Sequence, residues 1–303
     1  SLDGIHAAIS EFYRCEDSFG FELKSYDTFP YPAEIRRLIK KVISQECCIA
    51  DISYLNFALS YLYANAVKNL CAENRFDYNM LDAIGMHGQT VWHSPEPKVI
   101  AGIPASSTFQ LGNPAVVAQK TGLTVCSDFR SADIAQGGQG APLVPVFDWH
   151  YFRKSDENVI MLNIGGIANI TYLPAKCSKE EVIAFDTGPG NCLIDDITEK
   201  LYDIPYDING EIARSGDLIK GIFGYLQKID FIRRKTPKST GRELFNENLL
   251  KAFDLSDYKK EDVIRTLTEF SAWSIAENIS LHADTKAKII ASGGGAHNRT
   301  LMK

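Results

Sequence analysis

The sequence contains no long apolar run. No stretch approaches the roughly 20 uninterrupted apolar residues that a membrane-spanning helix requires. The N-terminus also lacks a basic region followed by an apolar one, the pattern of a secretory signal. These absences argue against a membrane partner and predict a soluble, cytoplasmic protein.

Positive charge and paired cysteines are also scarce. The 32 Lys and Arg residues are outnumbered by 38 Asp and Glu residues, giving a formal net charge of -6. This balance argues against a nucleic acid partner, because phosphate backbones attract basic proteins. The seven cysteines include no C-x-x-C pair and fit neither a disulfide framework nor a zinc site. We expect reduced, mostly buried thiols.

The chain is long enough for two domains. It has 303 residues, and 45% of them are hydrophobic. The stretch richest in glycine, at residues 137–140, predicts a boundary between domains at 1–136 and 137–303. The chain opens in mid-motif at Ser1 and ends at Lys303 soon after a glycine loop, so we expect that terminal segments are missing.

Periodicity predicts a mixture of strands and helices. Weak alternation indicates an antiparallel ribbon at residues 5–9 and 19–26. Apolar residues that recur every three or four positions indicate helices at 32–41 and 54–70. A third helix is expected to begin at Asn113-Pro114 and to end at Gly122, which suits the N-cap, first-turn and C-cap preferences. Short strands are expected at residues 81–85, 123–127, 159–163, 182–185 and 289–291.

Three of these strands run directly into glycines, at residues 165–166, 188–190 and 293–295. Glycine lets a backbone approach a ligand closely, and successive free amides form an anion site that suits phosphate. The Gly165-Gly166 pair would equally make a plain hairpin turn. Neither G-x-x-x-x-G-K-[ST] nor G-x-G-x-x-G occurs, so a different phosphate-binding architecture is implied.

Asp186 is the leading candidate for chemistry. It ends a strand and precedes Gly-Pro-Gly and a helix that Asn191 is expected to cap. A carboxylate in this position can act as a general base, or it can simply accept hydrogen bonds from its own turn. Asp195 and Asp196, on the following helix, are expected to be solvated.

Two polar groups in the first half are weaker candidates. His87, Gln89 and Thr90 follow a short strand and could orient a polar substrate, although a lone histidine often satisfies a local backbone group. Arg130 lies in sequence between two acids, Asp128 and Asp133, which suits a ligand carboxylate or an internal ion pair. In the second half, the polar loop at 238–243 could close over phosphates or simply meet water.

Taken together, the motifs resemble those of the anhydro-N-acetylmuramic acid kinase family over nearly the whole chain. The resemblance implies an α/β protein with the two-domain actin-like ATPase fold, which is ribonuclease H-like and has its active site in an interdomain cleft. This superfamily also includes acetate kinase, sugar kinases, a heat-shock chaperone and actin. The strings that carry the resemblance are residues 1–4, 85–90, 128–145, 163–169, 185–191, 238–245 and 293–298.

The resemblance also implies roles for individual residues. Asp186 would be the catalytic base. Contacts to ATP would come from Ser1, Leu2, Asp3, Gly4, Asn163, Gly165, Gly166, Asn169, Gly188, Gly190, Asn191, Gly293, Gly294 and Gly295. Contacts to the sugar would come from His87, Gln89, Thr90, Asp128 and Arg130. The motifs do not identify residues that hold Mg²⁺.

The implied reaction uses ATP and Mg²⁺ to open 1,6-anhydro-N-acetylmuramic acid with water and to phosphorylate its 6-oxygen. The products would be N-acetylmuramic acid 6-phosphate and ADP, in cell-wall (murein) recycling. Rival interpretations are another sugar kinase of the superfamily and a nucleotide-dependent scaffold, and a homodimer is possible. One departure from the family pattern is His6, where an aspartate is usual.

Overall fold

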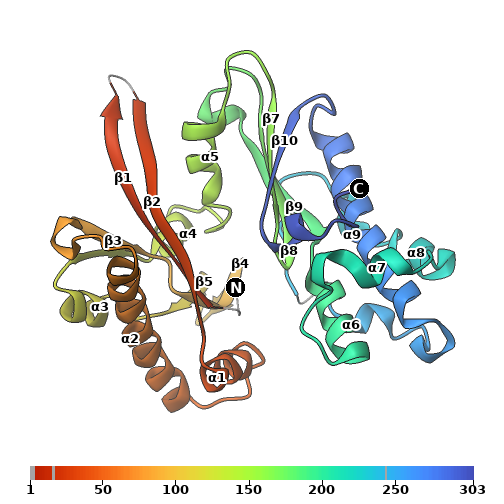
Figure 1. Ribbon diagram of the computed structural model, residues 1–303, viewed down its shortest axis with the longest axis horizontal. Helices are drawn as coiled ribbons and strands as arrows, with labels where there is room; N and C mark the ends of the chain where they lie inside the picture. Colours follow the sequence, from red (N-terminus) through yellow and green to blue (C-terminus); the bar gives the residue numbers. More distant parts are fainter. Residues whose placement is uncertain (1–3, 16–17, 243) are drawn as a thin grey trace. The chain divides into compact units, whose positions relative to one another are not determined.

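The computed structural model describes residues 4–15, 18–242 and 244–303, and the chain folds as two compact units. The first unit ends at Leu143 and the second is Val144–Lys303, so the division falls a little beyond the glycine-rich stretch. Both units mix helices with strands (Figure 1). The α/β class expected from the sequence is therefore confirmed.

Among its described residues, the first unit contains three strand pairs. β1 (Gly4–Cys15) and β2 (Ser18–Pro30) form an antiparallel ribbon in which Gly4 lies opposite Pro30, as the alternation predicted. β3 (Ala83–Met86) pairs in parallel with β6 (Thr124–Ser127). β4 (Gln89–Ile100) and β5 (Ile103–Leu111) form an antiparallel hairpin that the sequence analysis did not anticipate.

The helices of this unit begin and end where local chemistry favours it. The Asn113 side chain accepts hydrogen bonds from the amides of Ala115 and Val116, and Gly122 ends the same helix with φ of 74°, which confirms the predicted caps. The elements are α1 (Ala33–Ile43), α2 (Ile49–Glu73), the 3-10 turn η1 (Tyr78–Met80), α3 (Pro114–Thr121) and α4 (Phe129–Ala135).

The second unit is built on a four-stranded sheet in the order β10-β7-β8-β9. β10 runs parallel to β7, and the other neighbours are antiparallel. Gly165 and Gly166 join β7 to β8 directly, so the hairpin interpretation of this glycine pair is correct. The strands are β7 (Val159–Ile164), β8 (Ile167–Leu173), β9 (Ile183–Pro189) and β10 (Lys288–Ser292).

A long helix, α9 (Lys260–His282), packs against β9, and α6 (Cys192–Tyr202) packs against α9 (Figure 1). Their shared core contains fully buried Ile197, Leu267 and Phe270 together with Phe185 of β9. The remaining elements are α5 (Val144–Phe152), α7 (Glu211–Ser215), α8 (Lys220–Leu226) and the 3-10 turns η2 (Lys179–Glu181), η3 (Ile208–Gly210), η4 (Asp230–Arg233), η5 (Glu247–Leu250), η6 (Leu255–Asp257) and η7 (Gly294–His297).

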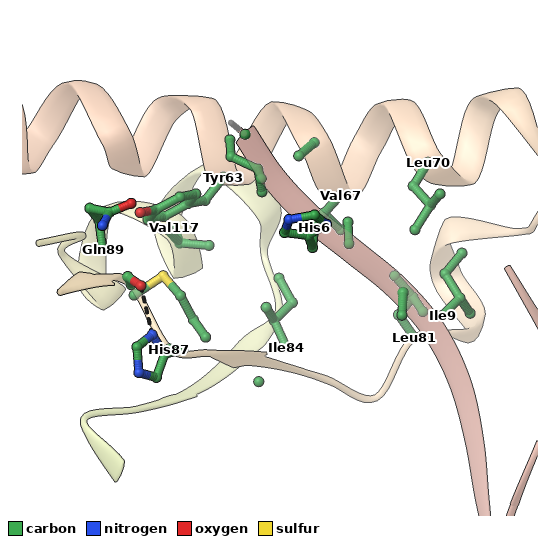
Figure 2. Close-up of a pocket in the computed structure, with 18 of the residues that line it drawn as sticks. His6, Ile9, Tyr63, Val67, Leu70, Leu81, Ile84, His87, Gln89 and Val117 are labelled. Carbon is green, nitrogen blue, oxygen red and sulfur yellow. Dashed lines mark hydrogen bonds between the residues drawn. The ribbon is translucent and has the colours of Figure 1, made fainter. Parts of the chain in front are cut away.

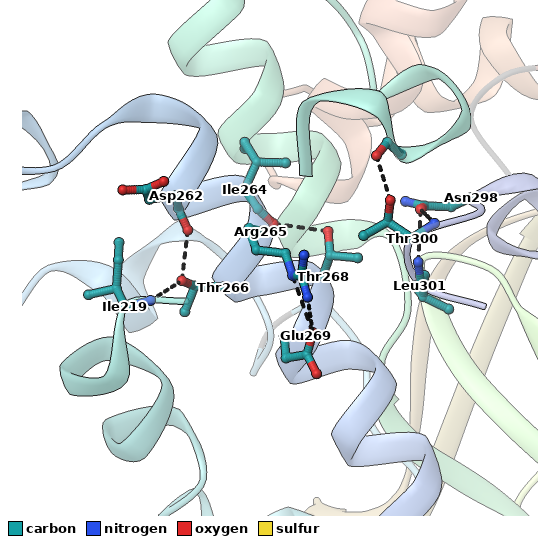
Figure 3. Close-up of polar contacts among 11 residues, drawn as sticks. Ile219, Asp262, Ile264, Arg265, Thr266, Thr268, Glu269, Asn298, Thr300 and Leu301 are labelled. Atoms are coloured by element: carbon teal, nitrogen blue, oxygen red, sulfur yellow. Dashed lines mark hydrogen bonds and ion pairs between the residues drawn. The ribbon is translucent and has the colours of Figure 1, made fainter. Parts of the chain in front are cut away.

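Side chains pin the surrounding loops to this core (Figure 3). The Thr266 hydroxyl accepts a hydrogen bond from the amide of Ile219 at 2.9 Å and donates to the Asp262 carbonyl at 2.7 Å. Beyond η7, the Thr300 hydroxyl donates to the Gly210 carbonyl at 2.7 Å. The segment that follows the last glycine loop is therefore tied to a second, distant loop.

Two compositional expectations can be compared with the structure. In the described part of the chain, none of the helices combines the length and apolar character needed for a membrane crossing. Cys71, Cys177 and Cys192 are buried, but Cys48 and Cys126 are exposed. The expectation of mostly buried thiols was therefore only partly correct.

Helix α2 offers a direct test of the first unit's core. Leu59 is completely buried, whereas Tyr54 on the same helix is 80% exposed. We expect Leu59→Ala to lower the free energy of unfolding by about 2–5 kcal/mol, because it leaves a cavity. Tyr54→Ala should change it by less than about 0.5 kcal/mol. Urea denaturation monitored by circular dichroism measures both, and equal effects would contradict this packing.

Candidate functional site

The three glycine segments of the second unit converge on one another. A side chain on Gly190 would collide with the Gly165 carbonyl, and one on Gly293 would meet Asn163 and the Ile164 carbonyl. A side chain on Gly295 would collide with Ile164. Such contacts leave no space for a Cβ atom. The ends of β7, β9 and β10 therefore come together at glycines that have no room for a side chain.

Hydrogen bonds fix the hairpin turn against the start of α6. The amides of Gly190 and Cys192 donate to the Gly166 carbonyl at 2.9 and 3.0 Å, and the Asn191 amide donates to the Gly165 carbonyl at 2.8 Å. These three amides are thus occupied by protein carbonyls. The expectation that successive free amides follow each strand is wrong for this helix terminus.

Asn191 does not cap α6 as expected. It holds the N-cap position without a side-chain capping bond, and its Nδ2 instead donates to the Ile164 carbonyl at 3.2 Å. This bond ties the helix start to the end of β7. The side chain therefore contributes to the convergence of the glycine segments rather than to helix termination.

A cation lies beside the hairpin turn. A Cβ placed on Gly166 would lie 3.7 Å from the Arg242 guanidinium, which also forms an ion pair with Asp196 at 3.1 Å. Neighbouring Asp195 is half-buried, whereas the sequence predicted a solvated side chain, and this burial raises its pKa to about 7. The positive charge of Arg242 therefore lies where the glycine turn would meet an anion.

Asp186 lies within β9, which continues to Pro189 instead of ending at residue 185 as expected, and it is directly opposite Asn169 of β8. Its Oδ2 accepts a hydrogen bond from the Thr240 amide at 2.8 Å, and its own amide donates to the Lys238 carbonyl at 3.2 Å. Thr240 and Lys238 belong to a loop more than fifty residues away in sequence. This loop, rather than the turn of Asp186 itself, orients the carboxylate.

Helix α9 fixes the turn after Asp186 through a buried polar face. Ser274 Oγ and Asn278 Nδ2 both donate to the Thr187 carbonyl at 2.9 Å, and Ser271 Oγ donates to the Gly190 carbonyl at 2.7 Å. All three side chains are completely buried. Sequence analysis missed them, although polar residues spaced by three and four positions within an apolar helix are a recognisable signal.

The remaining predicted phosphate-binding positions fall into two groups. Gly188 precedes Gly190 at the end of β9, and its Cβ position is filled by Ser274. Gly294 begins η7 near Asn191. Gly4 begins β1 in the first unit, and Ser1, Leu2 and Asp3 lie outside the described residues.

In the first unit, His87 and Arg130 form a defined pair. Arg130 Nε donates to His87 Nε2 at 2.8 Å, and Arg130 Nη1 donates to the Gly140 carbonyl at 2.6 Å. His87 Nδ1 lies 2.8 Å from the Gly88 carbonyl. Since a carbonyl can only accept, Nδ1 carries the proton and Nε2 is the acceptor. Desolvation, with a further contribution from the Arg130 charge, lowers the pKa of His87 and favours this neutral form.

The expected ion pair at Arg130 is absent. Among the described residues, no salt bridge joins this guanidinium to Asp128 or Asp133. Asp133 Oδ2 instead accepts from the Gly140 amide at 2.7 Å. Asp128 takes a left-handed conformation, with φ of 59°, at the start of α4. The acids therefore shape the turns around Arg130.

A cavity of about 360 Å³ opens beside this pair. His87 and Gln89 lie toward one end, and Ile9, Leu70 and Leu81 lie toward the other (Figure 2). Gln89 is buried and donates from Nε2 to the Thr90 carbonyl at 3.1 Å. The cavity therefore has one polar and one apolar end.

His6, which replaces the expected acid, also lines this cavity. Its Nδ1 lies 2.6 Å from the Tyr26 hydroxyl and 3.0 Å from the Thr28 hydroxyl. Within the described part of the chain, no group of three or more His, Cys, Asp or Glu side chains could hold a metal ion. The imidazole of His6 therefore contacts two hydroxyls at Nδ1, those of Tyr26 and Thr28.

Comparison with known proteins identifies the relatives of this chain. A family model described as anhydro-N-acetylmuramic acid kinase matches residues 1–303. Proteins named anhydro-N-acetylmuramic acid kinase from Bacillus cereus (strain AH187) and Bacillus thuringiensis (strain Al Hakam) are 42% and 41% identical over 311 residues. In both cases the match covers 100% of this chain and 80% of the relative.

A solved structure of the activator of the 2-hydroxyisocaproyl-CoA dehydratase from Clostridium difficile with bound ADPNP is a weaker match. It has a TM-score of 0.34 and 14% identity, covering 72% of this chain and 81% of that one. A similarity this low does not establish a shared arrangement of domains.

The pairing of His87 with Arg130 can be tested by titration. We expect Arg130→Met to raise the pKa of His87, because the variant removes a nearby positive charge. Nitrogen-15 NMR of the imidazole measures both the pKa and the tautomer. Replacement of exposed Lys68 by Met is the matched control and should leave the titration unchanged. An unaltered titration in Arg130→Met would contradict the pairing.

Proposed function

Because the chain belongs to the anhydro-N-acetylmuramic acid kinase family, we propose that Asp186 is the general base with which this sugar kinase opens the 1,6-anhydro ring of its substrate. The observation that carries the proposal is the position of the Asp186 carboxylate. It is held by the Thr240 amide at 2.8 Å, on the strand that leads into the converging glycine segments. A carboxylate that a backbone amide holds in place is suited to activating water.

The proposed reaction couples two bond changes. Asp186 accepts a proton from water while the water oxygen bonds to C1 of the sugar and the bond between C1 and the 6-oxygen breaks. The electron pair of that bond stays on the 6-oxygen, which becomes the nucleophile toward phosphorus. ATP supplies the phosphoryl group and leaves as ADP. The sugar product is N-acetylmuramic acid 6-phosphate, and one proton is released.

The glycine segments suit the phosphate tail of ATP. The Gly165-Gly166 turn is the part with open space, because a Cβ on Gly166 would meet no atom closer than 3.7 Å. The Arg242 guanidinium beside it can offset phosphate charge. Gly293, Gly294 and Gly295 are proposed to lie near the adenosine. Asn163, Asn169 and Asn191 surround the turn and can contribute amide groups.

Magnesium is proposed as a companion of the nucleotide. Mg²⁺ is commonly held by substrate phosphates, water and only one or two carboxylates. This mode fits a chain whose described residues contain no group of three or more ligating side chains. Bound Mg²⁺ would offset negative charge on the phosphates.

The sugar is proposed to contact the polar cluster of the first unit. His87, Gln89, Thr90 and Asp128 provide donors and acceptors suited to hydroxyl and amide groups. Arg130 directs two of its five N–H donors to His87 and Gly140, which fixes the guanidinium plane. A guanidinium fixed in this way can recognise the lactyl carboxylate of the sugar.

Family membership does not favour the rival interpretations. A kinase for an ordinary hexose would transfer phosphate without adding water, and a scaffold of the actin kind would not turn over a small sugar. A homodimer and a cytoplasmic location in cell-wall recycling remain proposals.

Replacing the proposed base provides the first test. We expect Asp186→Asn to reduce kcat by at least about 100-fold, because the amide keeps the size of the side chain but cannot accept the proton. Affinity for ATP, measured by calorimetry, should change little. Asp257→Asn, at an exposed acid of the same unit, is the control. Wild-type turnover by Asp186→Asn would remove Asp186 from this role.

The composition of the product provides an independent test. Incubation with ATP and 1,6-anhydro-N-acetylmuramic acid in ¹⁸O-labelled water should yield a sugar that has gained one phosphoryl group and one ¹⁸O atom. Rapid quenching and mass spectrometry detect both additions. Efficient phosphorylation of N-acetylglucosamine or glucose, with the anhydro sugar left untouched, would instead support the hexose kinase alternative.

A further inference from the structure

Lys238 is a buried cation whose charge the sequence predicted to meet water or phosphate. The residue is only 7% exposed. Its ammonium group donates to the carbonyls of Phe231 and Ile232 at 3.1 and 2.8 Å, and to Asn278 Oδ1 at 2.6 Å. An ammonium group has three N–H donors, so protein acceptors use all of them. Burial of a charge is tolerated when it is fully hydrogen-bonded in this way.

Aromatic rings complete the environment of the ammonium group. Its nitrogen lies 4.9 Å from the centre of the Phe231 ring and 5.6 Å from that of Phe185, within the range of cation–π attraction. Phe185 is the residue immediately before Asp186 on β9. The cation therefore contacts the strand that carries the proposed base.

The backbone near Lys238 holds Asp186 directly. The Lys238 carbonyl accepts from the Asp186 amide, and two residues later the Thr240 amide donates to the Asp186 carboxylate. Anchoring the Lys238 side chain therefore fixes the segment that makes both contacts. Displacement of this segment would move the Thr240 amide, which orients Oδ2 of Asp186.

Asn278 connects the same cation to the other side of Asp186. Its Oδ1 accepts from Lys238, and its Nδ2 donates to the carbonyl of Thr187, the next residue after Asp186. Asn278 is completely buried on α9. The side-chain amide of Asn278 thus links the Lys238 loop and α9 to β9.

We infer that Lys238, held by Asn278, is a positioning residue that fixes and electrostatically supports the Asp186 carboxylate. This inference rests on the proposed role of Asp186 as the base. Lys238 does not contact the reacting atoms. It acts through the Thr240 amide and through its positive charge, which favours the ionised form of a nearby carboxylate.

The charge of Lys238 should also make turnover sensitive to alkaline pH. Burial lowers the pKa of Lys238 to about 8, opposed by the negative charge of Asp186 and assisted by the positive charge of Arg234. His282 on α9 also faces this group, and its own pKa is lowered by desolvation and by Lys238. The ammonium form, with its three donors, is thus present below about pH 8 and lost above it.

The test compares Lys238→Met with Lys228→Met, a control at an exposed lysine of the same unit. Lys238→Met should lower kcat by between about 10-fold and 100-fold, as expected for a misplaced catalytic group, with both KM values changed less than about twofold. Its kcat profile should lose the fall above pH 8, and the acidic limb should move to higher pH. The control should match the wild type in kcat, in both KM values and in both limbs of the pH profile.

Asn278→Ser provides the second variant if Lys238→Met does not fold. It keeps Lys238 but removes the bridging amide, so kcat should fall while the alkaline limb remains. Wild-type kcat and pH profile in a folded Lys238→Met, or in Asn278→Ser where the first variant does not fold, would overturn the inference. Asp186→Asn is assayed in parallel: turnover by that variant would overturn the proposed function and this inference together, whereas an inactive Asp186→Asn beside a fully active Lys238→Met would overturn this inference alone.

Discussion

The close approach of the Gly165-Gly166 turn to the start of α6 is the constraint on which the second unit's site depends. Three amides at the start of α6 donate to two carbonyls of the turn, and this approach requires glycine at position 190, where a Cβ atom would collide with the Gly165 carbonyl. Because the contact joins β7 and β8 to β9 and α6, it sets the position of the strand that carries Asp186. The glycines at 293 and 295 extend the same contact to β10. The polar face of α9 holds the β9 turn from its other side, because Ser271, Ser274 and Asn278 replace water as donors to carbonyls that burial would otherwise leave unpaired.

Structural features set by neighbouring residues could largely be predicted from the sequence, whereas contacts between residues far apart in the chain could not. The caps of α3, the ribbon of β1 and β2 and the Gly165-Gly166 hairpin depend on neighbouring residues, so their signals lie within a few positions. The hairpin of β4 and β5 was missed, because exposed positions predominate along its outer half. Lys238 was expected to meet phosphate or water, yet its partner Asn278 lies 40 positions away. Asp186 could be put forward as a candidate from the sequence because its strand and glycine context is local.

Each unit holds a positively charged side chain, Arg130 in the first and Lys238 in the second, and the partners of the two charges differ. In the first, a neutral imidazole accepts from a guanidinium, so the pair carries one positive charge and no compensating carboxylate. In the second, a buried ammonium lies near a carboxylate but bonds to neutral acceptors. Within the described residues, neither Arg130 nor Lys238 forms a salt bridge. Both charges are therefore held by neutral acceptors.

The place where the glycine segments 165–166, 188–190 and 293–295 meet also restricts how this sequence can diversify. Any missense change in the codons for Gly190 or Gly295 introduces a carbon atom where a carbonyl or a branched methyl group already lies. A substitution at either position therefore cannot be neutral unless a second change also moves the end of the opposing strand. Variation that tunes the enzyme must arise instead in the loops that surround this junction.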